Sequence, residues 1–522
     1  MLICLSSDAK RRLLKRARNP PGSKSPLKFD TYTLNHAALV GQSEVIDLFF
    51  ITDCYNYTSY FQVAWLTDFE KELSRRRVFV NKGSAAFSHN AFFKTRAGAR
   101  KSSDFSSISI FGSQDLADRF SLTPSQAGFG LTSFSVRQTS LADQCPLGGR
   151  CDPTARYRAA DASCNNLENP LWGKAGTPFQ RTLLPVYSDG VWRPRVAESG
   201  GPLPSARLVS INIIPDVDAP SELETHNVMQ WGQFVDHDLT HTPLFRLNDG
   251  NSSGIQCCTE DGSAPVSRLV LHPECFPIDI PINDPFFRRH NQRCMNFVRS
   301  MPGPNLECSF GYGEQMNQIT HLHDASNVYG SDEDESGELR EYRGGLLRTY
   351  SRGGATEKGL LPQEEGEAEA EECEISRFLQ RSQDRKCFKA GDSRSNEQPG
   401  LTAFHTVWLR EHNRLARELA YLNPHWDDEQ LYQEARRILI AEMQVGLYFS
   451  FTCVNHIIFQ HITYNEWLPV VIGTDFMSEL DILPLSHGHS NKYSAKINPT
   501  ILNSFATAAF RFGHTLVQGL LE

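Results

Sequence analysis

The sequence predicts a mainly α-helical fold with little β structure. Several long segments repeat apolar residues at helical spacing, whereas the alternation of apolar and polar residues that is typical of strands is scarce. From Cys145 onward, Cys, Pro and Gly separate these segments, as expected of loops between helices. A chain of 522 residues can bury a large core and can form more than one structural unit.

Three predicted helices carry most of the functional argument. The first spans Ser221–Leu239 and opens with the serine and glutamate pattern of a capping box. The second spans Thr402–Leu422. The third opens at Asn498-Pro499, a cap residue followed by proline at the first helical position, and carries His514. Because each segment has an apolar stripe, we expect all three helices to be buried.

The composition changes near residue 145, which suggests a domain boundary. Residues 1–144 are rich in Ser, Lys and Arg and show a helical pattern only in patches such as Asn35–Phe50. We interpret them as a leader or pro-region that is partly disordered. Residues 145–522 are the predicted catalytic domain, and its acidic run Glu364–Glu374 is interpreted as a solvated loop.

Charge and hydropathy argue against nucleic-acid binding and against a membrane span. The net charge is −9, so the chain has no excess of positive charge for the phosphates of a nucleic acid. No run of about 20 apolar residues is present, so we expect no membrane span.

The cysteines indicate an oxidising compartment. The chain has 13 of them, many in loops, and closely spaced pairs do not recur at the spacing of a zinc finger. Disulfides are therefore the preferred interpretation, although spacing alone does not determine their connectivity. The glycosylation sequons at Asn56 and Asn251 agree with a secreted, extracellular protein, although no signal peptide is recognisable at Met1.

The first predicted helix contains an unusual histidine. Gln233 and His237 are four residues apart and share one face of the helix, while Asp236 and Asp238 flank the imidazole. A lone histidine such as His226 is more often a structural residue. Two carboxylates and an amide around one imidazole, however, cost desolvation energy that a purely structural helix would avoid. We therefore predict a functional role for His237.

This stretch resembles the distal helix of the animal haem peroxidases, the family of myeloperoxidase, thyroid peroxidase and peroxidasin. The resemblance runs from about Cys145 to the last residue and is nearest to the invertebrate chorion-type peroxidases and peroxinectins. Other motifs of the family follow in the same order, namely Tyr157–Asn166, Leu322–Ser331, Ala390–Glu397, Leu409–Leu415 and Phe510–Leu516.

The resemblance implies a hydrogen-peroxide-dependent oxidoreductase with haem b. His237 would be the distal acid/base residue, a role that suits an imidazole near its neutral form. Arg394 would stabilise the negative charge on the departing oxygen, because a guanidinium keeps its charge. Gln233 would bind the distal water or a halide.

The resemblance also assigns the residues that hold the cofactor. His514 would ligate the haem iron and Arg511 would pair with a haem propionate. Asp236 and Glu397 match the carboxylates that form ester links to haem methyl groups in the family. Gln398 replaces the methionine that makes a third link in myeloperoxidase, which argues against strong chloride oxidation.

A calcium site is implied beside the distal histidine. Asp238 matches the family ligand, and Thr320, the carbonyl of Leu322, Asp324 and Ser326 would complete the shell. Calcium prefers such oxygen ligands. The alternative is that Asp324 merely caps a helix.

The chain departs from the family pattern in two places. Val445–Gln460 is an apolar and aromatic insertion within a predicted core helix. The chain ends at Glu522, so relative to the family it is C-terminally truncated and lacks the Asn that hydrogen-bonds the proximal histidine.

Two functions remain open from the sequence. The preferred one is a peroxidase that oxidises phenolic, tyrosyl or halide donors and acts in extracellular cross-linking or defence. The alternative is an inactive or haem-free adhesion or matrix module whose partners are extracellular matrix or cell-surface proteins.

Overall fold

The structure of the chain is a computed structural model. It describes residues 27–42, 63–81, 84, 86–87, 90, 94–215, 217–249, 253–351, 359–364, 387–444, 462–483 and 493–518. The insertion Val445–Gln460, the sequons at Asn56 and Asn251 and most of the acidic run Glu364–Glu374 lie outside the described residues.

Helices dominate the described part of the chain, which confirms the predicted mainly α-helical fold. The longer helices are α2 (Thr31–Gln42), α3 (Val63–Arg75), α5 (Ala97–Arg119), α7 (Ala206–Ile213), α8 (Asn227–Leu239), α12 (Pro399–Leu422) and α13 (Asp428–Gln444). The shorter ones are α6 (Pro124–Gly128), α9 (Ser326–Tyr329), α10 (Glu333–Glu338), α14 (Leu468–Ile472), α15 (Thr474–Glu479) and α16 (Asn503–Thr507). Turns of 3₁₀ helix are η1 (Gly130–Ser133), η2 (Val136–Gln138), η3 (Ala142–Gln144), η4 (Phe287–His290), η6 (Ser393–Asn396) and η8 (Ala509–Leu516), and η7 (Ile462–Trp467) is a π-helical turn.

The strands are short and antiparallel. They are β1 (Thr177–Pro178), β2 (Ile278–Asp279), β3 (Cys294–Met295), β4 (Pro302–Gly303) and β5 (Glu314–Asn317). Within the described residues β5 is the central strand of a sheet with β1 and β4, and β2 pairs with β3.

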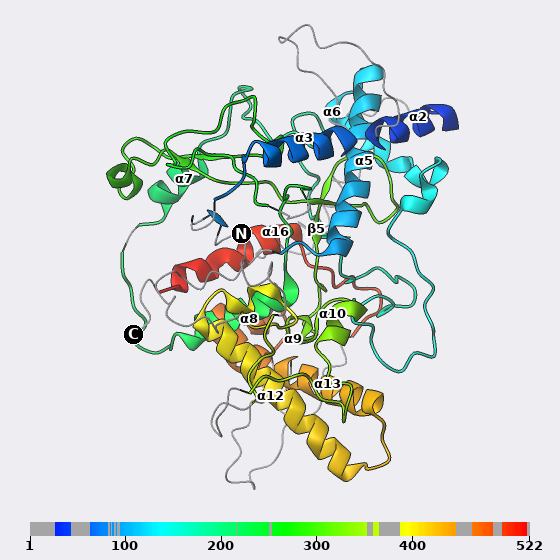
Figure 1. Ribbon diagram of the computed structural model, residues 1–522, viewed down its shortest axis with the longest axis vertical. Coiled ribbons are helices and arrows are strands. Elements are labelled where there is room, and N and C mark those ends of the chain that lie inside the picture. The colour runs from blue at the N-terminus through cyan, green and yellow to red at the C-terminus, as the bar shows by residue number, and fades with distance from the viewer. Residues whose placement is uncertain are drawn as a thin grey trace.

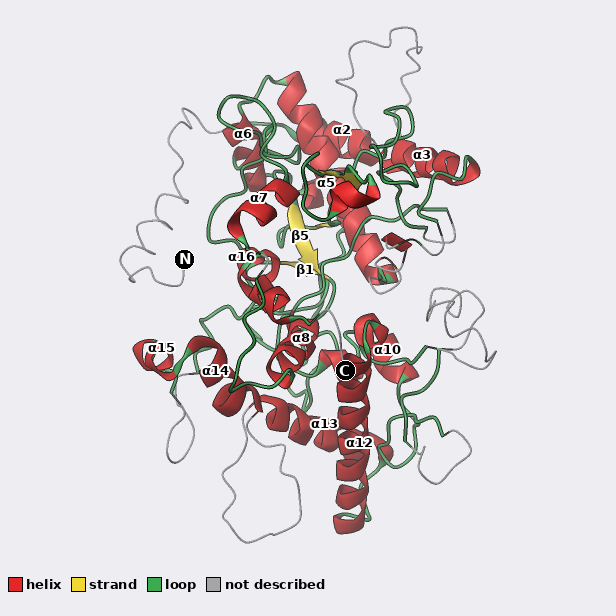
Figure 2. Ribbon diagram, turned by 90° about the vertical axis from the view of Figure 1, so that its left-hand side faces the viewer, coloured by secondary structure: helices red, strands yellow, loops and turns green. Residues whose placement is uncertain are grey.

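The elements gather in two groups, with the C-terminal segment between them (Figures 1 and 2). One group contains α2, α3, α5 and the β1-β5-β4 sheet, and the other contains α8, α10, α12 and α13. The second group has its own apolar core, in which Trp231 and Phe234 of α8 pack with Trp408 of α12 and Tyr432 of α13. This core holds α8 against α12.

The helices before residue 145 are integrated with the rest of the fold. Leu34 of α2 and Phe105 of α5 share a core with Phe310, which lies beyond the predicted boundary. The boundary at residue 145 stays a prediction, and the long helix α5 is an element that the sequence pattern did not indicate.

The cysteines in the predicted loops form disulfides. The pairs are Cys145–Cys308, Cys151–Cys164, Cys257–Cys275 and Cys258–Cys294. The first of them closes a loop of 163 residues and ties the segment after α6 to the segment before β5. Among the described helices, none has the length and apolarity that a membrane crossing requires.

Candidate active site

Helix α8 carries the predicted catalytic histidine, but it begins later than the sequence indicates. The helix spans Asn227–Leu239, not Ser221–Leu239. The Ser221 hydroxyl does accept the backbone N–H groups of Leu223 and Glu224, both at 3.2 Å, so it caps an isolated turn. Leu223 is 90% exposed, and without a core to pack against this turn does not extend into the helix.

His237 lies in the buried last turn of α8. Its Nε2 atom is 3.8 Å from Oε2 of Glu397, and its Nδ1 atom has no hydrogen-bond partner among the described residues. Burial, and then the positive charge of Arg394, hold the pKa of His237 well below its usual range. The imidazole is therefore neutral near pH 7 and is available as a proton acceptor.

Arg394 is fixed beside His237 by a buried carboxylate. Asp392 caps the 3₁₀ helix η6 by accepting the backbone N–H of Arg394 at 2.9 Å. The Arg394 side chain donates to the same carboxylate through Nε and Nη2, each at 2.8 Å, and Nη2 also donates to the carbonyl of His237 at 3.3 Å. Burial alone would raise the pKa of Asp392, but the Arg394 guanidinium holds it well below its usual range. The pair is thus ionised, and the guanidinium has a single orientation.

An amide and carboxylate cluster connects α8 to the start of α12. Gln233 donates to Oε2 of Glu397 at 3.3 Å, and Gln398 donates to Oε1 of Gln233 at 3.0 Å and also to Gln230. Gln398 is the N-cap of α12 and accepts the N–H of Gly400. Burial raises the pKa of Glu397, so this carboxyl binds a proton more readily than an exposed glutamate does.

Asp236 and Arg511 form an ion pair across the site. Nη1 of Arg511 donates to Oδ2 of Asp236 at 3.0 Å, while Thr240 donates to Oδ1 at 2.7 Å. The contact places the 3₁₀ segment η8 against α8. His514 is on the same segment but is exposed.

The third predicted helix is wrong in its start and in its burial. The chain forms α16 at Asn503–Thr507 and then η8 at Ala509–Leu516, and Ala506 is the buried residue of the two. Asn498 accepts the N–H of Thr500 at 3.0 Å, and the amide of Gln180 donates to the carbonyls of both residues. These bonds hold the chain after Asn498 beside Gln180, so the helix cannot begin there.

The five predicted calcium ligands come together at the end of α8. The Ser326 hydroxyl donates to Oδ1 of Asp238 at 3.1 Å, and the Thr320 hydroxyl donates to Oδ1 of Asp324 at 2.7 Å and lies 3.5 Å from the carbonyl of Leu322. Burial raises the pKa of Asp324 to about 7, and the charge of Asp238 acts in the same direction. Two carboxylates, two hydroxyls and a carbonyl suit a hard cation, which would also offset the repulsion between the carboxylates.

The loop after Leu322 holds Asp238 from several sides. Oδ2 of Asp238 lies 2.6 Å from Nδ1 of His323 and accepts the N–H of Ala325 at 3.1 Å. Within the described ranges, no three His, Cys, Asp or Glu side chains come together as they would around a zinc ion. The oxygen cluster around Asp238 therefore differs in kind from a transition-metal site.

Two buried histidines near the site were not indicated by the sequence. Nδ1 of His241 lies 3.5 Å from Oδ2 of Asp392, and burial lowers the pKa of His241 to about 4. His405 of α12 packs edge-on against Phe234 with 5.0 Å between the ring centroids. His241 lies beyond the end of α8, so helical spacing from His237 does not identify it.

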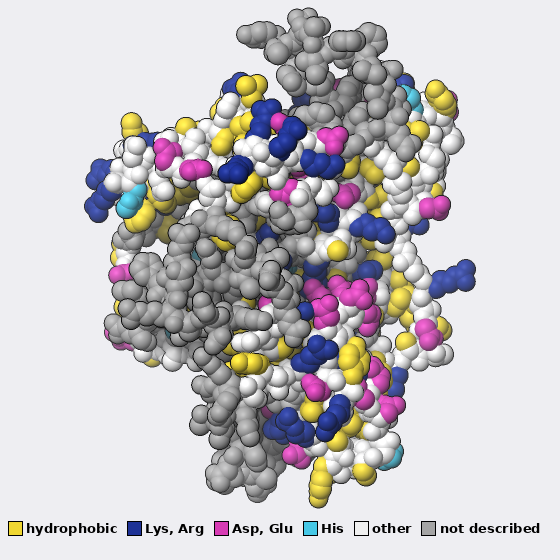
Figure 3. All heavy atoms as spheres, in the orientation of Figure 1, with side chains coloured by type: hydrophobic (Ala, Val, Ile, Leu, Met, Phe, Trp, Pro, Cys, Tyr) yellow, Lys and Arg dark blue, Asp and Glu magenta, His cyan; other side chains and the backbone are white. Residues whose placement is uncertain are grey.

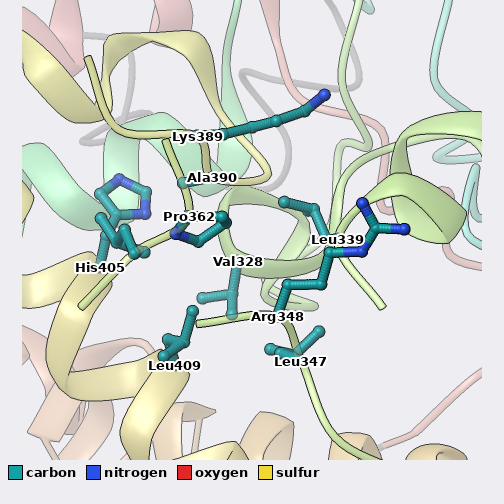
Figure 4. A pocket seen from close by; sticks show the side chains of 10 residues that line it. Val328, Leu339, Leu347, Arg348, Pro362, Lys389, Ala390, His405 and Leu409 are labelled. Carbon is teal, nitrogen blue, oxygen red and sulfur yellow. The ribbon is translucent and has the colours of Figure 1, made fainter. Parts of the chain in front are cut away.

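A small cavity lies behind the site, on the far side of His405. It is lined mostly by apolar side chains, and Figure 4 shows the His405 ring at one end of it. Its volume of about 10 Å³ is room for no group larger than a water molecule, so it is not a substrate or cofactor pocket.

The residues of the distal side fit a haem group. His237 is neutral and has a buried nitrogen without a partner in the described part of the chain, and Arg394 is a fixed cation beside it. The acidic residues Asp236 and Glu397 and the cationic Arg511 gather around the same turn of α8. The feature that supports a haem at this position is the neutral imidazole beside a fixed cation, because Arg511 is already paired with Asp236. The exposed His514 contributes no contact that supports the proximal side.

The family assignment comes from sequence comparison. A family model described as animal haem peroxidase matches residues 157–522, more than two thirds of the chain. The chain belongs to the animal haem peroxidase family.

Relatives in this family are similar over most of this chain. A chorion peroxidase of Aedes aegypti is 40% identical over 416 residues, which are 79% of this chain and 48% of that protein. Human myeloperoxidase is 38% identical over 405 residues, which are 74% of this chain and 49% of that protein. A human peroxidasin homolog is 42% identical over 385 residues, 70% of this chain and 23% of that protein. The chain thus spans less than half the length of these relatives.

Solved structures show a more distant similarity. Peroxidase A from Dictyostelium discoideum is 26% identical, with a TM-score of 0.47, over 69% of this chain and 60% of that one.

Proposed function

We propose that this chain is a haem-dependent peroxidase that uses hydrogen peroxide to oxidise phenolic, tyrosyl or halide donors. The observation that carries the proposal is the pair of buried groups in the distal site. The imidazole of His237 is neutral, and the guanidinium of Arg394 beside it is locked by Asp392. A base and a fixed cation in one water-poor site are what proton transfer and charge stabilisation at a peroxide require.

His237 and Arg394 divide the work on the peroxide. Nε2 of His237 would accept a proton from one oxygen of hydrogen peroxide and return it to the other oxygen. The two electrons that reduce the peroxide would come from the donor through bound haem, and with two protons from donor or solvent both oxygens end as water. The negative charge that develops on the leaving oxygen is stabilised by Arg394, which keeps its own protons. Gln233, anchored by Glu397 and Gln398, orients a water molecule or a halide beside His237.

The cofactor is haem b, held by residues from α8, the turn before α12 and η8. When bound, haem supplies the redox centre through which the donor is oxidised. His514 would ligate the iron and Arg511 would pair with a propionate. Asp236 and Glu397 would attach the macrocycle through ester links.

Calcium is proposed as a structural ion at Asp238. Thr320, Leu322, Asp324 and Ser326 would supply its other oxygen ligands. Since Asp238 follows His237 directly in α8, the ion would fix the rotation of the helix and hence the direction of the imidazole.

An extracellular setting suits these proposals. The disulfides of the described residues agree with an oxidising compartment, and a cross-linking or defence role would use tyrosyl or small phenolic donors.

The test compares His237 of α8 with His226, which immediately precedes that helix. The full chain is reconstituted with haem, and the Soret band and peroxide-dependent oxidation of a phenol are measured. His237→Ala should retain the Soret band and lower kcat by about 10²- to 10⁴-fold, the range for loss of a general acid/base residue. His226→Ala is the matched control, because this residue precedes α8 away from the site and should leave kcat unchanged.

The alternative function is a haem-free or inactive adhesion or matrix module. The exposed position of His514 is the observation that favours it. A folded chain that shows no Soret band after reconstitution would support this alternative, and equal kcat values for His237→Ala and wild type would contradict the proposed role of the imidazole.

A further inference from the structure

A cleft lined by arginines lies between α13 and the loop that precedes β1. Its volume is about 480 Å³, and its walls include Arg156 and Arg158 from the loop and Arg436 and Arg437 from α13. Figure 1 shows this loop, in blue-green, passing beside the orange helix α13. The Cys151–Cys164 disulfide closes the loop, so both of its arginines are held on the same short segment.

The cleft has more positive charge than the surrounding protein neutralises. Glu434 accepts from Arg156 at 2.6 Å and from Arg437 at 2.9 Å, and the Tyr157 hydroxyl donates to it at 3.1 Å. Within the described residues, no other carboxylate forms an ion pair with the four arginines of the cleft. Glu434 thus neutralises Arg156 and Arg437 directly, while Arg158 and Arg436 interact with the charge of Asp324 without forming an ion pair within the described residues.

The basic cluster contrasts with the net negative charge of the whole chain. The net charge of the whole chain is −9, and on the face drawn in Figure 3 the basic side chains are interspersed with acidic ones. A cluster of like charges destabilises the fold unless counter-charges are bound.

Arg436 is the buried member of the arginine cluster. It is 4% exposed, and its Nε atom has no hydrogen-bond partner among the described residues. Its Nη1 atom donates to the carbonyl of Arg158 at 3.3 Å, and its guanidinium lies 5.6 Å from the ring centroid of Tyr329. The charge of Asp324 acts on Arg436, but within the described residues no carboxylate lies at ion-pair distance from it, so a bound anion would offset the desolvation cost that remains.

We propose that this cleft binds a tetrahedral oxyanion group, the phosphate or sulfate ester of a small molecule or sugar. The planar fork of arginine matches two oxygens of such a group, and several forks around one cleft surround it. The volume of the cleft exceeds that of a single oxyanion and leaves room for the ring that carries it. The site is separate from His237 and does not depend on haem.

Calorimetry of the full, haem-free chain with matched sugars tests the site. The probes are glucose 6-phosphate, glucose 6-sulfate and glucose, titrated at low ionic strength because exposed charges are screened by salt. Binding of one or both esters, without binding of glucose, is the expected result, and the ester that binds more tightly identifies the source of the oxyanion. Absence of heat for both esters at millimolar concentration, or equal binding of glucose, overturns the proposal.

Variants assign the binding to this cleft. Arg158→Gln removes an exposed side chain, so the fold should be retained, and it should weaken ester binding at least tenfold. Arg436→Gln should also weaken ester binding at least tenfold, provided that circular dichroism shows this variant to be folded. Arg193→Gln, an exposed arginine whose partner is Asp189, is the control and should change Kd by less than twofold. Ester binding that is unchanged in Arg158→Gln would place it outside the cleft and would contradict the inference.

Discussion

The Asp392–Arg394 pair gives the sharpest prediction about the distal site. Asp392→Asn keeps the size of the side chain and removes its charge. In the wild type this carboxylate accepts three hydrogen bonds from Arg394, from the backbone N–H at 2.9 Å and from Nε and Nη2 at 2.8 Å. The asparagine amide group would oppose the guanidinium donors with N–H donors of its own, so at least one buried contact is lost.

The expected magnitude follows from the burial of the pair. Asp392 is 1% exposed and Arg394 is 2% exposed. Removal of one partner from such a buried pair costs about 3 to 5 kcal/mol of the free energy of unfolding, because the remaining charge is left without compensation. Asp68→Asn is the matched control, since Asp68 pairs with Lys71 at 3.2 Å on the surface and should lose at most about 1 kcal/mol.

Urea unfolding of the three proteins, followed by circular dichroism, measures these losses. In the reconstituted enzyme, Asp392→Asn should also lower kcat by about 10²-fold or more, because Arg394 is no longer aimed at the developing charge. Equal unfolding free energies for Asp392→Asn and Asp68→Asn would refute the argument that this carboxylate holds Arg394.

Two further predictions concern stability. Replacing Cys145 and Cys308 by serine opens a loop of 163 residues and should lower the free energy of unfolding by about 5 kcal/mol. Opening the 13-residue loop between Cys151 and Cys164 should lower it by about 3 kcal/mol. Chemical denaturation measures both losses, and a larger loss for the shorter loop would show that loop closure does not control the effect. Burial lowers the pKa of His405 to about 4, so between that value and about 6.5 the unfolded chain binds a proton that the folded chain does not, and stability falls as the pH falls through this window. His405→Gln should therefore lose about 2 kcal/mol less than the wild type between pH 7 and pH 5, and identical losses would contradict a neutral buried His405.

The predicted residues of α8 lie together in the structure because they are neighbours in the chain, and their roles stay predictions. Gln233, Asp236 and His237 share two turns of one helix, and the helical spacing that identified them is set by backbone geometry alone. Arg394 and Glu397 are likewise only three residues apart in the chain, so they lie close together in space. The contact between these two groups required the family resemblance, since no local pattern reports that α8 packs against the start of α12.

Helix α5 shows why the helices before residue 145 could not be predicted from the sequence pattern. This helix packs against α2 through very close backbone contacts, in which a Cβ atom on Gly41 would lie 2.3 Å from the carbonyl of Ile108 and one on Gly112 would lie 2.7 Å from that of Ala37. Close packing of this kind uses small residues, including several buried serines. Such residues leave no apolar periodicity in the sequence, so the segment resembled a polar leader.

The predicted start positions of the first and third helices were wrong for a different reason. Both predictions rested on cap residues, Ser221 and Asn498, and both residues do accept local N–H groups. A cap satisfies a turn, but the turn becomes a helix only where tertiary contacts cover it.

The last turn of α8 has a consequence for how this protein can change in evolution. Successive side chains on a helix point about 100° apart, so Asp236, His237 and Asp238 face three different neighbours. Their contacts are with Arg511, with Glu397 and with the loop at Ala325, respectively. A single insertion or deletion within the helix would rotate all three into the wrong surroundings at once. Length variation should therefore be confined to the exposed chain before Asn227, and the spacing of these three residues should stay the same in any relative that keeps their contacts.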